Sequence, residues 1–224
     1  RDLHLSIRRQ RQMCIRNRAQ VKANIFADNK INISMLVQYL EPEAILFELL
    51  SPYGFNSATV RQIFESVISQ SGKIFYSETH ELLKDRGYLI LKKKDSLKIE
   101  RYNIHKDETT ISRPIHLKIE RAPVNGDLSI EKNPDIIYID ADKLTYPLTL
   151  RKWKQGDWFM PFGMKGKKKV SDYFSDNKFS LFDKEAAWLL CSGDDIVWIV
   201  GHRADERFRV TDKTTEIVKI IYSK

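Results

Sequence analysis

A chain of 224 residues, of which 42% are hydrophobic, is long enough to bury a core as one large domain or as two small ones. Its net charge of +8 favours an acidic partner such as a nucleic acid. No apolar run approaches the roughly 18 residues that a membrane span needs, and the chain opens without the apolar stretch of a signal peptide, so we expect neither a membrane protein nor a secreted one. Cys14 and Cys191 lie far apart, without a CxxC spacing, which predicts a reduced, cytoplasmic chain without a structural metal.

The positive charge is concentrated in two stretches. Residues 1–18 contain six Arg and one Asp, whereas residues 151–170 contain seven Lys or Arg and one Asp. We interpret residues 1–18 as an artefact or a disordered arm and assign them no function, because they show neither a helical nor a strand period; a basic nucleic-acid-binding arm is the alternative. The second stretch is also rich in glycine, which indicates a shaped loop facing phosphates. A merely solvated charged face is the alternative.

The first elements in chain order are helices. Pro42 suits the first position of a helix, and Asn56 is a good N-cap for the next one. Ser71 and Gly72 are typical of a helix end. Apolar residues that would share one face of the second helix recur at helical spacing: Val60, Ile63, Phe64, Val67 and Ile68. The pattern predicts a small helical unit whose apolar stripes form its core.

After Gly72 the apolar period changes to two, which predicts strands. Residues 73–77, 79–84 and 88–94 read as a meander with a tight turn before the last strand, although residues 79–84 are also compatible with a helical turn. Further strands are predicted on the same small sheet: 111–119, 135–140 and 148–153. A domain boundary near residues 100–110 is only weakly marked, since no Gly/Ser-rich linker occurs there.

Beyond the basic stretch, short helices alternate with strands. Ser171 is expected to cap one helix, and Asp183 is expected to cap a second that carries Leu189 and Leu190. Three more strands are predicted, the first apolar enough to be buried on both faces: 196–200, 207–210 and 215–222. The chain is therefore predicted to be α+β, a small helical unit followed by a mostly antiparallel, β-rich C-terminal domain with short helices.

Motifs for catalysis or metal binding do not emerge from the sequence. Gly163 and Gly166 are three residues apart and no Lys-Ser/Thr pair follows, so the Walker phosphate loop is not formed. The five histidines show no ligand spacing, and Cys191 has no neighbouring histidine to activate it. We predict no catalytic, cofactor-binding or metal-binding residue in this chain.

One stretch carries a family resemblance. Residues 156–172, GDWFMPFGMKGKKKVSD, fit the pattern GDxFxPxGMxGxKKxSD and resemble the signature of the C-terminal domain of tRNA(Ile)-lysidine synthetases. Residues 206–211, ERFRVT, are similar to the closing strands of that domain. Residues 45–55 and 71–86 resemble the family's helical substrate-binding region and the strands that follow it. The resemblance covers about residues 20–224.

The resemblance implies a two-part organisation. Residues 19–105 would be the helical substrate-binding region with its hairpin, and residues 106–224 the C-terminal tRNA-binding domain. That domain is similar to one in phenylalanyl-tRNA synthetase β chains, which implies a β-sandwich-like fold of unusual topology.

The resemblance also implies an activity. Members of the family are cytoplasmic bacterial ligases that use ATP, with Mg²⁺, to adenylate C2 of the wobble cytidine in an isoleucine tRNA with a CAU anticodon, after which lysine displaces AMP. Their adenylating domain carries an SGGxDS phosphate loop, which we do not find in this chain. Residues 191–195 are superficially similar but lack the second glycine and precede a strand rather than follow one. We therefore expect the tRNA-binding part of such an enzyme, inactive alone and without a cofactor of its own.

Candidate site residues follow from the charge pattern and the matching positions. Those expected to bind tRNA are Lys152, Lys165, Lys167, Lys168, Lys169, Arg203, Arg207 and Arg209. Those expected to shape the loop are Gly156, Asp157, Pro161, Gly163 and Gly166. Trp153, Trp158 and Phe162 are expected to anchor the loop to the core rather than to stack on bases. The alternative function is a protein-interaction or dimerisation module without RNA contact, and a homodimer stays open in either case.

Overall fold

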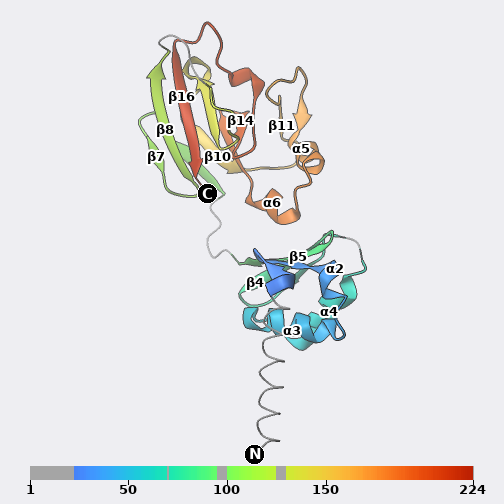
Figure 1. The fold of residues 1–224 in the computed structure, drawn as a ribbon. Helices are drawn as coiled ribbons and strands as arrows, with labels where there is room; N and C mark the ends of the chain where they lie inside the picture. Colours follow the sequence, from blue (N-terminus) through green and yellow to red (C-terminus); the bar gives the residue numbers. More distant parts are fainter. Residues whose placement is uncertain (1–22, 70, 95–99, 125–129, 224) are drawn as a thin grey trace, which may run out of the picture. The chain divides into compact units, whose positions relative to one another are not determined.

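The computed structural model describes residues 23–69, 71–94, 100–124 and 130–223, and the chain divides into two compact units between residues 96 and 97 (Figure 1). The predicted arm at residues 1–18 lies outside the described residues. We call the described residues up to 94 the first unit and those from 100 onward the second unit.

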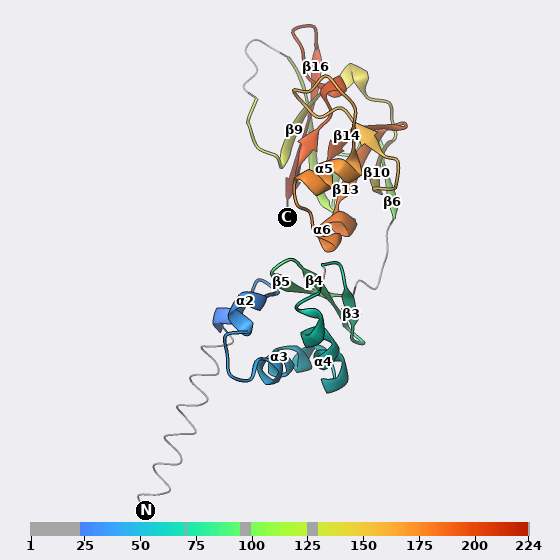
Figure 2. The same cartoon turned by 90° about the vertical axis from the view of Figure 1, so that its right-hand side faces the viewer.

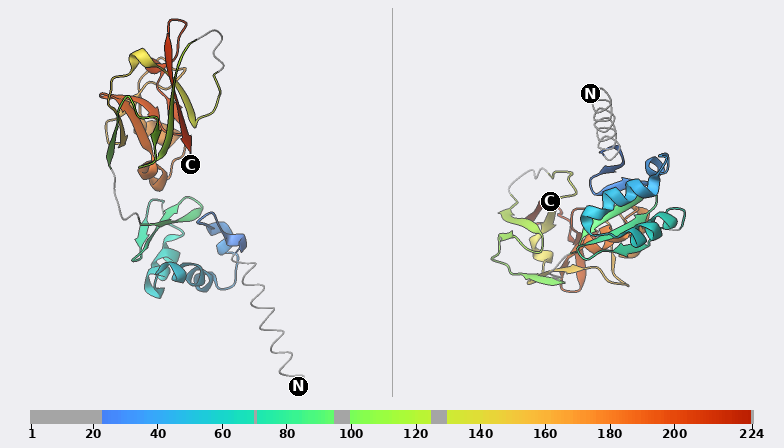
Figure 3. Two further views of the ribbon diagram at one scale, coloured as in Figure 1. Left: turned by 90° about the vertical axis from the view of Figure 1, so that its left-hand side faces the viewer. Right: turned by 90° about the horizontal axis from the view of Figure 1, so that it is seen from below.

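The first unit is an antiparallel sheet with helices on one face (Figures 1 and 3). Its strands, in the order β1-β2-β5-β4-β3, are β1 Phe26–Ala27, β2 Lys30–Asn32, β5 Tyr88–Lys93, β4 His80–Asp85 and β3 Ile74–Tyr76. Its helices are α2 Ile33–Leu36, α3 Pro42–Leu50, the 3-10 turn η1 Ser51–Tyr53 and α4 Ser57–Ser66.

Local sequence rules account for most of this unit. Pro42 opens α3, and the Asn56 side chain caps α4 by accepting a hydrogen bond from the Thr59 amide at 2.8 Å, both as predicted. Residues 80–84 of the predicted segment 79–84 lie in strand β4, so the helical alternative is wrong. The predicted apolar stripe is too long, because α4 ends at Ser66 and Ile68 is 95% exposed.

The second unit packs two sheets face to face, with a third layer on one side (Figures 1 and 2). The five-stranded sheet, in the order β15-β14-β13-β10-β6, contains β15 Arg203–Ala204, β14 Asp195–Ile199, β13 Trp188–Ser192, β10 Leu148–Lys152 and β6 Arg101–Ile104. The four-stranded sheet, in the order β7-β8-β16-β9, contains β7 Thr110–Ile111, β8 His116–Pro123, β16 Glu216–Ser223 and β9 Ile136–Asp140. The α+β, sandwich-like prediction is confirmed.

The third layer covers the outer face of the five-stranded sheet. It consists of the ribbon β11 Trp158–Phe159 with β12 Lys168–Lys169, and of helices α5 Val170–Asp176 and α6 Leu181–Ala186. Figure 2 shows both helices in front of β13 and β10. Leu190 of β13 faces the core between the sheets, whereas Leu189 and Cys191 pack under this layer with Phe159 and Phe174. The apolar strand at residues 196–200 is thereby buried on both faces, as predicted.

Two predictions about the strands are wrong. The middle strands do not form one small sheet, because their partners come from distant parts of the chain: β8 pairs with β16, and β6 pairs with β10. The pairing of β6 with β10 also assigns β6 to the second unit, whereas the boundary predicted after residue 105 left it in the first. Short-range periodicity identifies a strand without identifying its partner.

Four further predictions in the C-terminal half are wrong. Ser171 lies inside α5 and does not cap it. Ser180, rather than Asp183, caps α6, and the two form a reciprocal capping box in which Asp183 is the third residue of the helix. Leu189 and Leu190 are buried on opposite faces of a strand, which a helix would not allow. Residues 207–210 form no strand, since Glu206–Phe208 is a 3-10 turn, η3.

Candidate nucleic-acid interface

The basic loop, which we define as residues 156–169, forms a two-stranded β-ribbon rather than an irregular loop. Its two ends pair as β11 and β12, with Trp158 opposite Lys169 and Phe159 opposite Lys168. Phe159 is fully buried against the five-stranded sheet, so the ribbon is seated on the core. The chain then enters α5 directly from Lys169. The tip of the ribbon is residues 161–166.

An ion pair fixes the entry to the loop. The Arg151 guanidinium donates to Asp157 through two nitrogens, Nη1 to Oδ2 at 2.7 Å and Nη2 to Oδ1 at 2.9 Å. The hydrogen bond to Asp157 raises the pKa of Arg151. The same carboxylate also accepts a hydrogen bond from the Lys154 amide at 2.8 Å. Gly156 takes a φ of +94° in the turn just before, a value that favours glycine. Asp157 therefore holds the loop entry through contacts inside the protein.

A second, more buried carboxylate fixes the exit of the first strand of the ribbon. Asp205 is 1% exposed and accepts the Met160 amide at 2.8 Å. It also accepts from Arg207 Nε at 2.9 Å and Nη2 at 2.8 Å, while Arg207 Nη1 donates to Asp195 at 2.6 Å. The hydrogen bonds to Asp205 and then to Asp195 raise the pKa of Arg207. The Arg207 charge is thus matched by two carboxylates.

Backbone hydrogen bonds hold the tip of the loop. The Phe162 amide donates to the Ala204 carbonyl at 2.9 Å, and the Gly163 amide donates to Glu206 Oε2 at 2.8 Å. The side chain of Arg203 donates to the Phe162 carbonyl. Gly163 has a φ of +82°, whereas Gly166 lies outside the left-handed region with no atom within 4 Å of an added Cβ. Of these two predicted loop-shaping glycines, only Gly163 occupies a conformation that favours glycine.

The four lysines of the loop differ in their surroundings. Lys168 forms an ion pair with Asp176 of α5, Nζ to Oδ2 at 2.6 Å. Lys167 places its Nζ 3.8 Å from the centroid of the Trp158 ring. Lys165 and Lys169 are exposed, and no ion pair engages either of them within the part of the chain that the structure describes. These two ammonium groups are the ones most available to an anionic partner.

The remaining predicted cations also have partners. Lys152 donates to the carbonyl of Ala186 at 2.9 Å and lies 4.2 Å from the centroid of the Trp188 ring. Arg209 pairs with Glu206, Nη1 to Oε1 at 2.8 Å, with a half-exposed side chain. The predicted residues therefore converge on one region only in part, since Lys152 is attached to the end of α6 instead.

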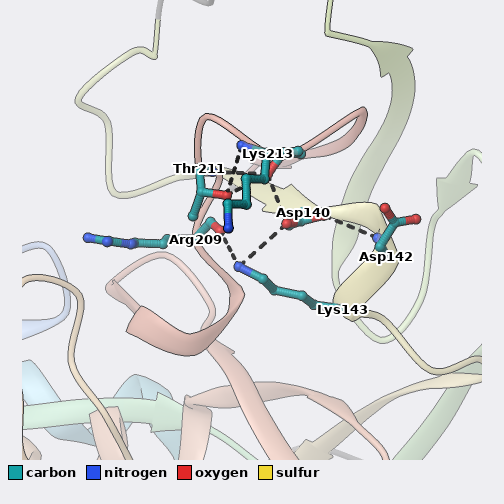
Figure 4. Close-up of polar contacts among 7 residues, drawn as sticks. Asp140, Asp142, Lys143, Arg209, Thr211 and Lys213 are labelled. Atoms are coloured by element: carbon teal, nitrogen blue, oxygen red, sulfur yellow. Dashed lines mark hydrogen bonds and ion pairs between the residues drawn. The ribbon is translucent and has the colours of Figure 1, made fainter.

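The segment that carries Arg209 is fastened by a separate polar cluster. Lys143 donates to the carbonyl of Arg209 at 2.7 Å and lies 3.4 Å from Asp140 (Figure 4). The buried carboxylate of Asp140 also accepts from the Thr214 hydroxyl at 2.8 Å. Figure 4 shows the Arg209 side chain extending away from this cluster. The backbone here is fixed while the guanidinium projects outward.

The aromatic residues of the loop have two roles. Trp153 packs edge-on against Phe174 at 5.4 Å and against the core cluster under the third layer, so it is anchored as expected. Trp158 instead lies under the Lys167 ammonium and within 4.8 Å of the Arg207 guanidinium. Phe162 does not anchor the loop, because its side chain is 48% exposed at the tip. The anchoring prediction is wrong for Phe162.

Sequence reasoning missed the acidic residues that organise the site. Asp205 and Glu206 together bind the amides of Met160 and Gly163, yet nothing in the basic pattern pointed to them. The available signal was their position next to Arg207, since a carboxylate beside an arginine often forms a charge-assisted pair. They supply the frame on which the lysines are presented.

The described residues give little support for a reactive cysteine, a metal site or a membrane-spanning helix. Burial raises the pKa of the Cys191 thiol to about 11, which keeps it protonated and unreactive near neutral pH. No group of three or more His, Cys, Asp or Glu within the described ranges is placed to hold a metal ion. Among those same residues, no helix has the length and apolarity needed to cross a membrane.

Comparison with known proteins gives a consistent family. A family model described as the TilS substrate binding domain matches residues 27–94, and one described as the TilS substrate C-terminal domain matches residues 148–221. The chain is 47% identical to a tRNA(Ile)-lysidine synthase from Parabacteroides distasonis over 88% of this chain and 45% of the relative. It is 40% identical to one from Bacteroides thetaiotaomicron over 89% of this chain and 44% of the relative. The chain thus spans about half the length of the curated relatives it matches.

Two solved structures show a distant likeness. One is a TILS C-terminal domain, with a TM-score of 0.48 and 16% identity over 55% of this chain and 97% of that chain. The other is an N-terminal fragment of the phenylalanyl-tRNA synthetase β-subunit from Pyrococcus horikoshii, with a TM-score of 0.41 and 14% identity over 87% of this chain and 67% of that chain.

Proposed function

Because the chain belongs to the tRNA(Ile)-lysidine synthase family, whose substrate-binding and C-terminal domains it carries, we propose that it is the tRNA-binding part of such an enzyme. The whole enzyme is proposed to be a cytoplasmic ligase that attaches lysine to C2 of the wobble cytidine of an isoleucine tRNA with a CAU anticodon. In this proposal ATP and Mg²⁺ act in a catalytic domain beyond these residues. The chain itself binds RNA and supplies no catalytic group.

The observation that carries the proposal is the pair of exposed lysines on a loop whose backbone is held in place. Lys165 and Lys169 are exposed, while Asp157 and Asp205 fasten the ribbon that presents them. Phosphate contacts position an RNA without reading its sequence, and duplex RNA is held largely by its shape, its phosphates and its 2′-hydroxyls. Cations fixed in space suit that task better than cations on a loose chain, because less conformational entropy is lost on binding.

The experiment is a filter-binding titration of the 224-residue chain against tRNA(Ile) at several salt concentrations. Each neutralised phosphate contributes about one unit to the slope of log K against log salt. We therefore expect the double variant Lys165→Ala/Lys169→Ala to weaken binding and to flatten the slope by about 1 to 2. Both residues are exposed, so the fold should be unaffected.

A matched control removes the same charge elsewhere in the second unit. Lys106 and Lys132 are also exposed, and Lys106→Ala/Lys132→Ala lowers the net charge equally. We expect this control to leave the slope nearly unchanged. Equal effects of both double variants would mean that only net charge matters and would overturn the loop as the binding site. No binding of unaltered chain to tRNA at low salt would overturn the proposed function itself.

A further inference from the structure

The tip of the basic loop exposes two large apolar side chains. Phe162 is 48% exposed and Met164 is 50% exposed, and they lie two residues apart. Most large apolar side chains of the second unit are buried in its two clusters. The exposed part of each side chain contributes nothing to the stability of the fold, and the two together form a small apolar patch on a loop that is otherwise charged. It therefore invites an explanation by contact with another molecule.

The tip is held in its shape by the protein. The turn closes by a hydrogen bond from the Met164 amide to the Pro161 carbonyl at 2.8 Å. The Phe162 amide and carbonyl are both bound, to Ala204 and to Arg203 respectively, and an isolated bridge links Pro161 to Asp205. The ring of Phe162 thus projects from a backbone with little freedom, and a preorganised ring loses little entropy when it is covered.

The positive charge around the tip indicates which kind of molecule could cover Phe162 and Met164. Lys165 follows Met164 directly, and Lys167 and Lys169 continue the same ribbon. Exposed rings among cations are the combination with which proteins hold unpaired nucleotides, because the ring stacks on a base while the cations meet the phosphates. A purely apolar protein surface would leave these ammonium groups without partners.

We propose that Phe162, supported by Met164, stacks on an exposed nucleobase of the RNA that the basic loop binds. This inference rests on the proposed function, and it assigns to the tip a contact different from that of the lysines. The base is either the open face of a terminal base pair or an unpaired nucleotide next to one. Both present the same flat π surface to the ring.

The test uses two RNA hairpins with the same seven-base-pair stem, one blunt and one with a four-nucleotide single-stranded 3′ extension. Base–aromatic stacking is strong enough that Phe162→Ala should raise Kd roughly five-fold or more. The increase should be the same at every salt concentration, because no phosphate contact is lost. Phe162→Trp should restore binding. Leu181→Ala is the matched control, since Leu181 is a 41% exposed apolar residue on α6 of the same unit.

The outcomes separate the two proposals. An effect on both hairpins places the ring on the terminal pair, and an effect limited to the extended hairpin places it on an unpaired base; either supports the inference. Unchanged Kd for Phe162→Ala, with the slope still flattened by Lys165→Ala/Lys169→Ala, overturns the stacking contact and leaves the proposed function standing. If Phe162→Ala changes only self-association in sedimentation, the tip is a protein contact and the inference is wrong. Absence of RNA binding in every form overturns the proposed function.

Discussion

The cations on the two sides of the basic loop differ in whether carboxylates of the protein bind them. On the side that faces the five-stranded sheet, the buried carboxylates of Asp157 and Asp205 bind Arg151 and Arg207 respectively, and the exposed Asp195 also binds Arg207. On the outer side, lysines project with few acidic neighbours. A count of basic residues combines these two populations, yet only the outer one is free to meet an anionic partner.

The difference follows the chemistry of the two cations. The planar guanidinium of arginine fits a carboxylate through two parallel hydrogen bonds, which suits a site with little water. The ammonium of lysine is compact and strongly hydrated, so it remains at the surface as a point charge. The same planar group also suits phosphate, so an arginine is weak evidence for an RNA contact only where carboxylates already bind its guanidinium. Arg207 illustrates this, because Asp205 and Asp195 already accept its hydrogen bonds.

The largest effect on stability is expected at Asp205, on the side of the loop that faces the five-stranded sheet. Replacing Asp205 by Asn should cost about 3 kcal/mol of unfolding free energy or more, because it leaves the Arg207 charge poorly paired in a site with little water. The Met160 amide would also lose a charged acceptor. Urea unfolding followed by tryptophan fluorescence would measure the change, since Trp158 and Trp198 lie in the same unit.

Asp195 provides the control, because it binds the same guanidinium from an exposed position. Its side chain is 52% exposed, and Asp195→Asn should cost less than about 1 kcal/mol. Equal losses for the two variants would contradict the distinction between an inner, structural side and an outer one. A small loss for Asp205→Asn would show that the loop is held mainly by the packing of Phe159.

A smaller effect should distinguish two glycines of the tip. Gly163→Ala should cost on the order of 1 kcal/mol, because an alanine resists the φ of +82° there. Gly166→Ala should be neutral or slightly stabilising, because its backbone lies outside that region and the space around it is open. The same urea measurement compares them. A larger loss for Gly166→Ala than for Gly163→Ala would show that the tip changes shape in solution.

Local rules predicted the elements whose causes lie within a few residues. The start of α3 at Pro42 and the Asn56 cap of α4 depend on neighbours in sequence, so both were predictable. The apolar run of β14 needs no partner to be recognised. The β8–β16 and β6–β10 pairings were not predictable in this way, because each strand's partner lies far away in the chain.

The same distinction between near and distant neighbours applies to the candidate site. The position of the lysines and of Gly163 in the motif was enough to name them as site residues, whereas the role of Asp205 depends on the Met160 amide 45 residues away. The exposure of Phe162 could not be predicted from its neighbours either, because Trp153 in the same stretch packs against the core and Trp158 lies against two cations. Sequence indicated which residues form the loop, and three-dimensional packing decided which of them face outward.

The smallest effect concerns two adjacent lysines of β12. The Lys168 charge is already matched by Asp176, so Lys168→Ala should change the slope of log K against log salt for tRNA by well under one unit. Lys169 is exposed and should account for about one unit when replaced by Ala. Filter binding over a salt series measures both, with the extra variant Asp176→Asn as a check. Removing that carboxylate frees the Lys168 ammonium, so Asp176→Asn should strengthen tRNA binding slightly. In the Asp176→Asn protein, Lys168→Ala should then flatten the slope.

The contradicting outcome would be a Lys168→Ala variant that flattens the slope as much as Lys169→Ala does. In that case the RNA displaces Asp176 from its ion pair, and an ion pair within the protein does not show which cations are unavailable to RNA.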